Sequence, residues 1–554
     1  MNPSSSQTGA RLLVKNLEAQ GVEHIFAIPG AKVDRVFDAL LDSPIKTHVC
    51  RHEQNAAFIA QGFGRITGQA GVCLVTSGPG CSNLTTGLAT ATSEGDPVVA
   101  IGGSVSLADR LKQTHQTMDT VSLFRPVTKF SAEIDSAQAV SEVLANAFRT
   151  AESGRPGAAF VSVPKDIMEG AAPGKVLTPV GPPSPGGGDP TALAKAARIL
   201  NGARSPVILL GLMASHPQNA AAVGEFLRAV RLPVMITYQA AGTVPRENLP
   251  LFCGRVGLFH NQPADRILDA ADAVLLIGYD AVEYDPCLWN AGKSRPLIHL
   301  DVLPCDIDNA YQPTVEITGN IALSLRALSP LLQAKPGAEA LTLLTEITRE
   351  LSAIRARGVS LSGAPVHPLR LVHELQELVT DDMTVISDVG SHYIWMSRYF
   401  QSFGPRRFLA SDGQQTLGVA LPWAIAASLC RPREKVISMS GDGGFLFSAM
   451  ELETAVRLKC NFVHLVWRDG SYNMVRIQQL AKYGRDAAVE FGTVDTVQFA
   501  QAFGAMGLAI RSAEDIGPVL KKALDTAGPV LIDVPVDYRE NAALVAQMHP
   551  DVIH

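Results

Sequence analysis

Two acidic turns in the last third of the sequence have the residue types needed to bind a cation. Asp442 lies in the turn Gly441-Asp442-Gly443-Gly444, directly after the apolar run 436–439. Asp469 begins a polar turn directly after a second apolar run, 462–467. Two turns that follow two strands would place both aspartates beside one hard cation, which takes oxygen ligands and keeps room for phosphate oxygens. The pair therefore predicts a diphosphate cofactor at the edge of a parallel sheet.

A third turn has groups suited to phosphate. The residues from Asp388 to His392 follow the apolar run 385–387. Ligands of open parallel sheets bind beyond the carboxyl ends of the strands. Backbone amides, the Ser391 hydroxyl and His392 could therefore contact phosphate oxygens at a helix N-terminus. The alternative is that His392 only caps a helix.

Glu53 is a candidate proton-exchanging carboxylate. It follows the run 47–49 and precedes the small and apolar residues 56–60. A carboxylate at the mouth of an apolar helix tends to have a raised pKa and can exchange protons near neutrality. The alternative is an ordinary glutamate at a helix start, stabilised there by the helix dipole. Local sequence alone favours this second interpretation.

The elements that must position these residues fall into three segments. Residues 171–190 are dense in Pro and Gly, which is typical of a linker, and a second break falls near 358–368. The predicted domains are therefore 1–175, 190–345 and 365–554. Each alternates short β-branched runs with helical patterns, which predicts an α/β protein of three doubly wound parallel sheets. The first and last segments share a strand, Gly-x-Gly, helix pattern, which indicates either two related domains or common turn chemistry.

Composition excludes several classes of protein. The net charge is −6 and there is no basic tract, which argues against nucleic-acid binding. No apolar stretch approaches the ~18–20 residues that span a membrane. The N-terminus lacks the pattern of a signal peptide. The eight cysteines are scattered without a Cys-x-x-Cys pair, which predicts reduced thiols in a cytoplasmic protein and argues against a zinc site.

Five motifs occur in the order and spacing of a known family. They are 28–30 (Ile-Pro-Gly), 51–53 (Arg-His-Glu), 76–80 (Thr-Ser-Gly-Pro-Gly), 441–443 (Gly-Asp-Gly) and the turn at Asp469. From about residue 10 to 540 the chain resembles the thiamine-diphosphate enzymes of the acetolactate synthase and pyruvate decarboxylase group. The resemblance implies a pyrimidine-binding first domain, a middle domain and a pyrophosphate-binding last domain. It also implies an active site built from two subunits, with a homodimer as the minimum and a homotetramer expected.

The resemblance assigns roles to individual residues. It implies Mg²⁺ coordination by Asp442, Asp469 and the Ser471 carbonyl, although the usual family residue at 469 is asparagine. Glu53 matches the glutamate that hydrogen-bonds N1′ of the aminopyrimidine, and Leu417 matches the apolar residue that bends the cofactor. The other implied cofactor contacts are Pro29, Gly30, Thr76, Asn83, Gly390, Ser391, His392, Gln414, Gly441, Gly443, Gly444, Tyr472, Asn473 and Met474.

Further residues bear on which family member the chain resembles. Segment 277–286 lacks the arginines of the Arg-Phe-Asp-Asp-Arg sequence that helps hold FAD in biosynthetic acetohydroxyacid synthases, so FAD is not expected. Gln478 stands where those enzymes place a tryptophan that favours 2-ketobutyrate, which suggests pyruvate as substrate. Gln116 matches a glutamine that faces the reacting centre. Lys129 and Arg476 are candidates for contacting anionic substrate, but a solvated or surface role is equally open.

The resemblance is closest to the catabolic, FAD-independent acetolactate synthases. It implies that two pyruvate molecules form 2-acetolactate and CO₂ through a hydroxyethyl adduct of thiamine diphosphate, feeding acetoin and butanediol formation. No regulatory subunit is expected. The alternatives are a 2-oxoacid decarboxylase of the same family, a biosynthetic acetohydroxyacid synthase, and a noncatalytic nucleotide- or flavin-binding protein that uses the middle sheet.

Overall fold

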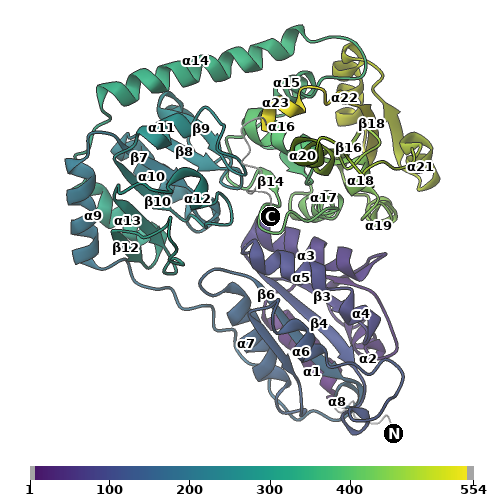
Figure 1. Cartoon of the computed structure of the whole chain (residues 1–554). Coiled ribbons are helices and arrows are strands. Elements are labelled where there is room, and N and C mark those ends of the chain that lie inside the picture. Colours follow the sequence, from purple (N-terminus) through teal and green to yellow (C-terminus); the bar gives the residue numbers. More distant parts are fainter. Residues whose placement is uncertain (1–6, 546–554) are drawn as a thin grey trace, which may run out of the picture. The chain divides into compact units, whose positions relative to one another are not determined.

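The computed structural model describes residues 7–545, which form three six-stranded parallel sheets with helices on their faces (Figure 1). This confirms the predicted fold class. Each sheet lies within one of the three predicted segments, whose boundaries stay predictions. By contacts, the described chain divides into two compact units. The first comprises the residues up to Pro183 with Leu421–Pro432 and Ser448–Cys460, and the second comprises the remainder.

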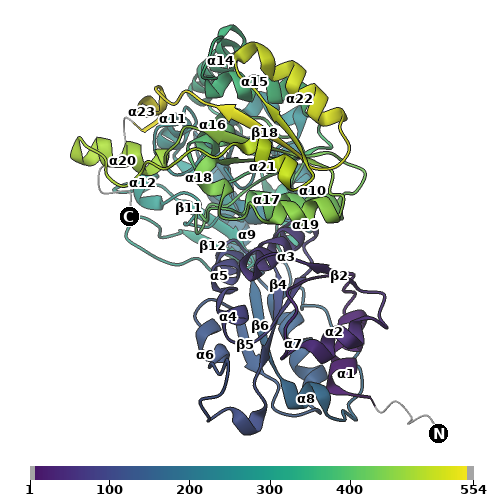
Figure 2. The ribbon, with the colours of Figure 1, turned by 90° about the vertical axis from the view of Figure 1, so that its right-hand side faces the viewer.

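The first sheet has the strand order β2-β1-β3-β4-β6-β5. In Figure 2, α1, α2 and α7 lie on one face and α4, α5 and α6 on the other. The strands are β1 (His24–Ala27), β2 (Lys46–Val49), β3 (Gly71–Val75), β4 (Val98–Ser104), β5 (Phe130–Glu133) and β6 (Ala158–Pro164). The helices are α1 (Gly9–Ala19), α2 (Asp34–Leu40), α3 (Glu53–Thr67), α4 (Pro79–Ser82), α5 (Thr85–Ser93), α6 (Thr120–Phe124), α7 (Val140–Glu152) and α8 (Lys165–Glu169).

The middle sheet has the order β12-β11-β10-β7-β8-β9. Its strands are β7 (Pro206–Leu210), β8 (Val234–Thr237), β9 (Phe252–Val256), β10 (Ala273–Ile277), β11 (Leu297–Asp301) and β12 (Val315–Thr318). Its helices are α9 (Pro190–Gly202), α10 (Ala220–Val230), α11 (Asp265–Ala270), α12 (Pro286–Trp289) and α13 (Ile321–Leu328). The long helix α14 (Ala338–Ser360) follows, so helical structure extends three residues past Arg357, into the predicted break.

The third sheet has the order β14-β13-β15-β16-β18-β17. Its strands are β13 (Thr384–Ser387), β14 (Phe408–Ala410), β15 (Val436–Gly441), β16 (Phe462–Arg468), β17 (Met506–Ala509) and β18 (Val530–Pro535). The helices of this part of the chain are α15 (Pro368–Leu378), α16 (Ser391–Tyr399), α17 (Ala420–Cys430), α18 (Asp442–Phe445), α19 (Glu451–Arg457), α20 (Asn473–Tyr483), α21 (Thr496–Ala502), α22 (Ile516–Asp525) and α23 (Asn541–Val545). By contacts, α19 and nearly all of α17 belong to the first compact unit.

The first and third sheets share one topology. Numbered within each sheet, both orders read 2-1-3-4-6-5. In both sheets, the second strand lies on one side of the first strand and the third strand lies on the other side. The strand order therefore reverses between the first and third strands. Ligands of doubly wound sheets bind at this point. The shared order favours related domains as the origin of the pattern noted in the sequence.

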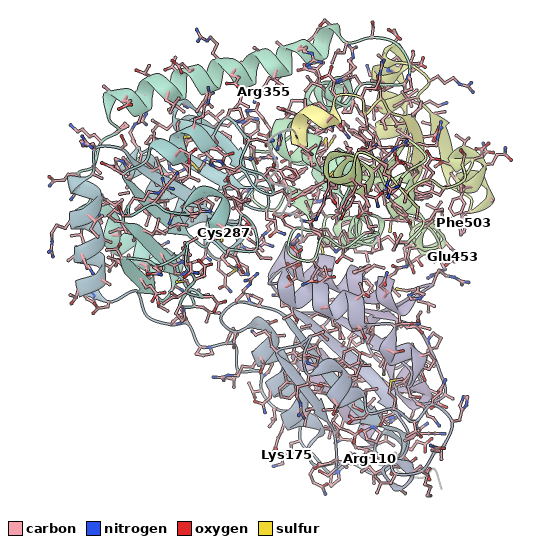
Figure 3. All side chains as sticks on the ribbon, in the orientation of Figure 1. Arg110, Lys175, Cys287, Arg355, Glu453 and Phe503 are labelled. Carbon is pink, nitrogen blue, oxygen red and sulfur yellow. The ribbon has the colours of Figure 1, made fainter. Side chains whose placement is uncertain are left out.

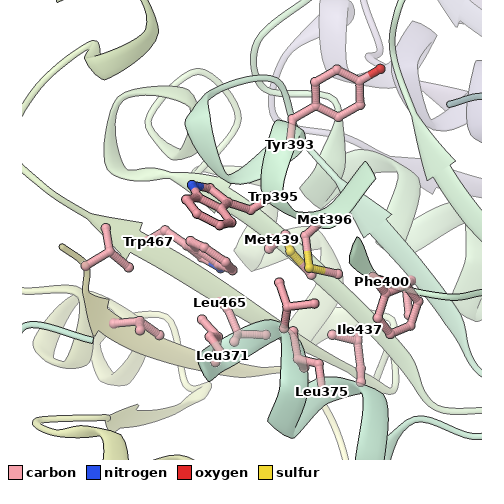
Figure 4. Packing of buried hydrophobic residues seen from close by; sticks show 14 of the residues in the cluster. Leu371, Leu375, Tyr393, Trp395, Met396, Phe400, Ile437, Met439, Leu465 and Trp467 are labelled. Carbon is pink, nitrogen blue, oxygen red and sulfur yellow. The ribbon is translucent and has the colours of Figure 1, made fainter. Parts of the chain in front are cut away.

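The core of the third domain fixes the strands that present the acidic turns. Ile437 and Met439 of β15 and Leu465 and Trp467 of β16 are fully buried against side chains of α15 and α16 (Figure 4). Met396 of α16 belongs to the same cluster. Because these strands are buried on both faces, they read as continuous apolar runs, as strands of parallel sheets do. The residues directly after the strands are therefore held in place by the packing of the strands themselves.

Candidate active site

The carboxyl ends of three neighbouring strands bring the predicted cation ligands together. Strands β13, β15 and β16 pair in parallel, so the turns after them meet at one edge of the sheet. The Asp442 carboxylate joins two of these turns, because its Oδ2 accepts a hydrogen bond from the Gly470 amide at 2.8 Å. Its Oδ1 accepts from the Gly443 amide at 3.2 Å. Asp442 is thus held toward the turn that carries Asp469.

Asp469 belongs to a hydrogen-bonded network that reaches the third turn. Its Oδ2 accepts hydrogen bonds from Ser471 Oγ at 2.7 Å and Asn473 Nδ2 at 2.9 Å. Asn473 Oδ1 in turn accepts from Ser391 Oγ at 2.8 Å. Side chains from the β13 and β16 turns are therefore linked. This network orients the predicted metal ligand and the predicted phosphate contact relative to each other.

Burial disfavours the charged forms of the two aspartates. Burial, with a further contribution from the Asp469 charge, raises the pKa of Asp442 to about 6. Burial also raises the pKa of Asp469. Within residues 7–545, no three His, Cys, Asp or Glu side chains gather into a metal-binding group. Two carboxylates and a turn carbonyl fit Mg²⁺, which is usually held by one or two carboxylates together with phosphate oxygens and water.

A cavity of about 310 Å³ opens beside this network. Two of the site residues predicted in this domain do not line the cavity. Asp442 does not, although the residues on both sides of it do. Gln414 is exposed and does not, although its neighbour Gln415 does. The predicted residues that line it are Gly390, Ser391, His392, Leu417, Gly441, Gly443, Gly444, Asp469, Ser471, Tyr472, Asn473, Met474 and Gln478. The structure therefore gathers thirteen predicted residues from four chain segments at one cavity.

His392 faces this cavity with an unsatisfied ring nitrogen. Its Nε2 is buried and has no hydrogen-bond partner in the part of the chain that the structure describes. Burial lowers the pKa of His392 to about 3, so the ring is neutral. The residue that caps α16 is Gly390, and no side chain caps it, so His392 does not fill that role. A buried unpaired polar atom is costly, and a ligand in the cavity would satisfy it.

Asp388 positions the loop that carries Leu417. Both of its carboxylate oxygens accept a hydrogen bond from the Gly418 amide, at 3.0 and 2.9 Å. Its Oδ1 also accepts from the Val389 amide. The β13 turn thereby holds the preceding residue, Leu417, at the cavity. The sequence offered a signal for this role, an aspartate directly after a strand, but its partner is 30 residues away.

In the other unit, Glu53 and its neighbours form a second cluster. Glu53 is the first residue of α3 and is half-buried. Its Oε2 accepts a hydrogen bond from Asn83 Nδ2 at 2.9 Å. Gly30 lies against Thr76, since a Cβ at Gly30 would approach the Thr76 side chain to 2.5 Å. Pro29 precedes Gly30 in the turn after β1, and the buried Thr76 Oγ1 has no partner in residues 7–545.

Gln116 adopts a backbone conformation that brings it to the turn after β3. Its φ is 65°, in the left-handed region that costs a residue with a Cβ about 1 kcal/mol or more. Its Oε1 accepts a hydrogen bond from Ser77 Oγ at 3.0 Å, and Gly78 leaves room for its Cβ. Backbone strain of this kind is often found at functional sites. The predicted residue Gln116 thus lies beside the turn that contains Thr76.

A glutamate from far along the chain fixes the start of α3. Glu451 Oε1 accepts hydrogen bonds from the backbone amides of Arg51 at 2.8 Å and His52 at 3.1 Å. It also accepts from Asn55 Nδ2 at 3.3 Å. These contacts lie within the first unit, to which the α19 segment belongs. Glu451 therefore orients the helix whose first residue is Glu53.

The two cations whose roles were left open have protein partners. Lys129 Nζ donates hydrogen bonds to the carbonyl oxygens of Thr150, Ser153 and Arg155 at 2.6–2.8 Å. This contact is structural, since it satisfies carbonyls at the end of α7. Arg476 forms ion pairs with Asp486 at 2.7 Å and with Glu490 at 3.4 Å. Neither observation favours direct binding of a substrate carboxylate.

Three family descriptions match successive parts of the chain. They are "Thiamine pyrophosphate enzyme, N-terminal TPP binding domain" over residues 7–123, the central domain over 193–328, and the "C-terminal TPP binding domain" over 388–534. The first and third contain the two clusters described above. Within residues 7–545, no helix has both the length and the apolar character needed to cross a membrane.

Curated relatives match over almost their whole length. The chain is 50% identical to "Acetolactate synthase, catabolic" from Raoultella terrigena, over 98% of this chain and 97% of the relative. It is 49% identical to "Acetolactate synthase" from Bacillus subtilis, over 98% and 95%. It is 31% identical to "Acetolactate synthase isozyme 1 large subunit" from Escherichia coli, over 96% and 94%. The chain therefore belongs to the acetolactate synthase family of thiamine pyrophosphate enzymes.

Proposed function

We propose that the protein is an acetolactate synthase of the catabolic type, which condenses two pyruvate molecules to 2-acetolactate with release of CO₂. The observation that carries this proposal is near full-length similarity at 50% identity to a catabolic acetolactate synthase. The geometry supports it, because the chain has an acidic, cavity-lining cluster and a separate Glu53 cluster. Thiamine diphosphate, when bound, supplies a carbon nucleophile and an electron sink for decarboxylation.

The third domain would bind the Mg²⁺ and the diphosphate. Asp442, Asp469 and the Ser471 carbonyl supply hard oxygen ligands of the kind that Mg²⁺ takes. A bound cation would stabilise the Asp442 carboxylate, whose pKa is raised by burial and, to a smaller extent, by the Asp469 charge. Ser391 and the buried Nε2 of His392 lie where they could contact phosphate oxygens. Leu417, held through Gly418 and Asp388, would pack against the cofactor.

Glu53 would hold and move the proton at N1′ of the aminopyrimidine. Its Oε2 is oriented by Asn83, which leaves Oε1 for the pyrimidine nitrogen. Glu451 fixes the helix start that carries it. Positioning of this kind matters because a proton-transfer group must lie within about 2.6–3.2 Å of its partner atom. Gln116 and Gln478 are the residues we assign to the acceptor pyruvate.

The middle domain supports a reaction without FAD. Its strand order, read from β9 to β12 as 3-2-1-4-5-6, is that of dinucleotide-binding sheets, whose pyrophosphate lies where the order reverses, between β7 and β10. At this point buried Glu283 accepts hydrogen bonds from the Leu212 amide at 2.9 and 3.0 Å. It also accepts from the Asp280 amide and the Thr237 hydroxyl. The chain's own carboxylate thus uses the donors that a pyrophosphate would need.

The site would be completed by a second copy of the chain. Large apolar side chains that line the third-domain cavity, or lie within three residues of its lining in sequence, are between 38% and 45% exposed, namely Leu446, Phe447, Tyr472, Val475 and Leu480. Exposed apolar groups beside a site are typical of protein interfaces. We propose a homodimer as the minimum, a homotetramer as the expected form, no regulatory subunit, and a cytoplasmic location.

The decisive experiment replaces Glu53 by Gln. Purified Glu53→Gln protein, supplied with pyruvate, Mg²⁺ and thiamine diphosphate but no FAD, is expected to lose acetolactate formation by about 100-fold or more, since proton transfer contributes about 10²–10⁴-fold. Exposed Glu142→Gln in α7 is the matched control, with expected wild-type activity. Full carboligase activity in Glu53→Gln would refute this role.

The product and acceptor distinguish the related functions. Acetolactate without stoichiometric acetaldehyde is expected, whereas a decarboxylase would release the aldehyde. Adding 2-ketobutyrate in competition with pyruvate tests the role of Gln478. A strong preference for 2-ketobutyrate would contradict the assignment and favour the biosynthetic alternative. The visible absorbance spectrum of the purified protein should contain no flavin band.

A further inference from the structure

A second cavity, of about 190 Å³, lies within the second unit between the middle and third domains. It is lined by residues of β8, β9, α14 and the C-terminal end of α16. Three arginines from three different elements line it: Arg255 of β9, Arg355 of α14 and Arg398 of α16 (Figure 3 labels Arg355). Among the described residues that line this cavity, none is acidic. The proposed function uses none of these residues.

The partners of these arginines are neutral. Arg255 is buried, and its Nη1 donates to the Ser397 carbonyl at 2.9 Å. Arg398 donates to Tyr238 Oη and Asn261 Oδ1. Arg355 has no hydrogen bond or ion pair to any residue in the range 7–545. Three positive charges thus line one cavity, and no described carboxylate forms an ion pair with them, although the Asp265 charge acts on Arg398.

Nearby acidic residues are already paired with other cations. Glu350 lies on α14 close to Arg355 in sequence, but it forms an ion pair with Arg266. Glu540 forms an ion pair with Arg357, which is also on α14. Helix α14 therefore carries one arginine with a carboxylate partner, Arg357, and one that lines the cavity, Arg355. Glu350 and Glu540 are therefore engaged with cations other than the three that line the cavity.

The electrostatics differ among the three arginines. Burial opposes the charge of Arg398, but Tyr238, Tyr399 and Asp265 outweigh it and raise the pKa of Arg398. Burial lowers the pKa of Arg255 to about 10, and the charge of Arg355 contributes to this shift. Burial also lowers the pKa of Arg355. Taking a cation out of water is unfavourable unless an opposite charge accompanies it. Guanidinium groups pair with carboxylates and phosphates through two parallel hydrogen bonds.

We propose that this cavity is a binding site for a small oxyanion, either a monocarboxylate or inorganic phosphate, held by the guanidinium groups of Arg355 and Arg398. The cavity's volume suits a compact anion rather than a nucleotide. Arg255, already bonded to Ser397, adds positive charge behind the ligand. The two anion sources share the same recognition chemistry and are distinguished by the experiment below.

Helix α16 joins this cavity to the cofactor cavity. Its first residues, Ser391 and His392, line the cofactor cavity, and Arg398 near its last turn lines the arginine cavity. Nine residues of helix span about 13 Å. An anion at Arg398 therefore contacts the element that carries two of the proposed phosphate contacts. Occupancy of the arginine cavity is expected to change the apparent affinity for thiamine diphosphate, and an unchanged affinity would overturn this coupling.

The test measures anion binding by the holoenzyme. Protein saturated with thiamine diphosphate and Mg²⁺ is titrated separately with sodium phosphate and sodium acetate, and with sodium chloride at matched ionic strength. Saturable binding of phosphate or acetate by calorimetry, with a rise in melting temperature beyond that in chloride, is expected. The anion that saturates identifies the source. Saturation by neither anion would overturn the proposal.

Variants locate the binding to this cavity. Arg355→Gln is expected to weaken anion binding by about 10- to 100-fold, which is typical for loss of a charged hydrogen-bond partner. Arg355→Lys keeps the charge but loses the planar fork, so an intermediate loss is expected. The matched control is Arg349→Gln, an exposed arginine of the same helix, which should bind as the wild type does. Equal binding by Arg355→Gln and wild type would refute the site.

Discussion

At the carboxyl edge of the middle sheet, Glu283 accepts hydrogen bonds from two backbone amides and one hydroxyl. At the carboxyl edge of the third sheet, Asp442 and Asp469 lie beside a cavity, and burial raises the pKa of both. Both edges belong to parallel six-stranded sheets and both carry acidic side chains. They differ in whether the surrounding chain provides enough donors to stabilise the negative charge.

This difference separates a structural carboxylate from the two carboxylates that we propose to bind a cation. Glu283 is almost fully buried, and its donors come from the ends of β7, β8 and β10. It acts as a fixed anion at the place where a dinucleotide sheet holds pyrophosphate. Asp442 instead joins two turns and has a like charge nearby. The edge that we propose for the diphosphate is thus the one whose acidic side chains are not stabilised by the chain's own donors.

The largest expected effect is at Asp442. Asp442→Ala removes the carboxylate that joins the two acidic turns, so Mg²⁺ affinity and kcat/KM should both fall by more than about 100-fold, since even indirect contacts to a metal are worth 10–100-fold. Titration of activity with Mg²⁺ at saturating thiamine diphosphate measures this. Exposed Asp525→Asn in α22 is the control. Wild-type Mg²⁺ dependence in Asp442→Ala would remove the proposed metal site.

Glu283→Gln should affect stability instead of metal binding. The amide NH₂ of glutamine would face backbone donors, which leaves at least one amide unpaired and costs about 2–3 kcal/mol. Urea unfolding followed by tryptophan fluorescence is a suitable measurement, since Trp289 is buried in the middle domain. The Mg²⁺ dependence should stay unchanged. Wild-type stability in Glu283→Gln, or an altered Mg²⁺ dependence, would contradict the contrast between the two edges.

The sequence revealed local features of the site better than distant ones. The turns at Asp442 and Asp469 were visible because each follows an apolar run directly, and strand ends in parallel sheets converge. Glu451 could not be linked to Arg51 from sequence, because 400 residues separate them. Glu283 and Asp388 have the same limitation, since their meaning depends on which backbone amides meet them in space. The loop near Gln414 was found, but its left-handed residue Gln415, with φ of 46°, turns a different side chain to the cavity.

The strands of the fold could be predicted because their burial leaves a local pattern in the sequence. Strands such as 273–277 and 462–467 are buried on both faces and read as uninterrupted apolar runs. Their order within each sheet depends on which helix crosses which face, and periodicity does not encode this. The repeated glycine turns were therefore only weak evidence that the first and third sheets share one strand order. Sequence patterns do not reveal cavities either. The arginine cavity, for example, is lined by residues that range from 236 to 403 in the sequence.

The smallest expected effect is at Asp469. Asp469→Asn keeps an oxygen ligand and removes one of the two like charges, so Mg²⁺ affinity should fall by less than about 10-fold. Because protons compete with the cation for Asp442, whose pKa is raised to about 6, Mg²⁺ binding by the wild type should weaken as the pH falls through about 6. Removing the Asp469 charge lowers the Asp442 pKa, so this loss should move to lower pH in the variant. Activity measured against Mg²⁺ concentration at several pH values tests both expectations. A loss as large as that of Asp442→Ala, with no shift in pH, would mean that the second charge is a required ligand and not a tolerated excess.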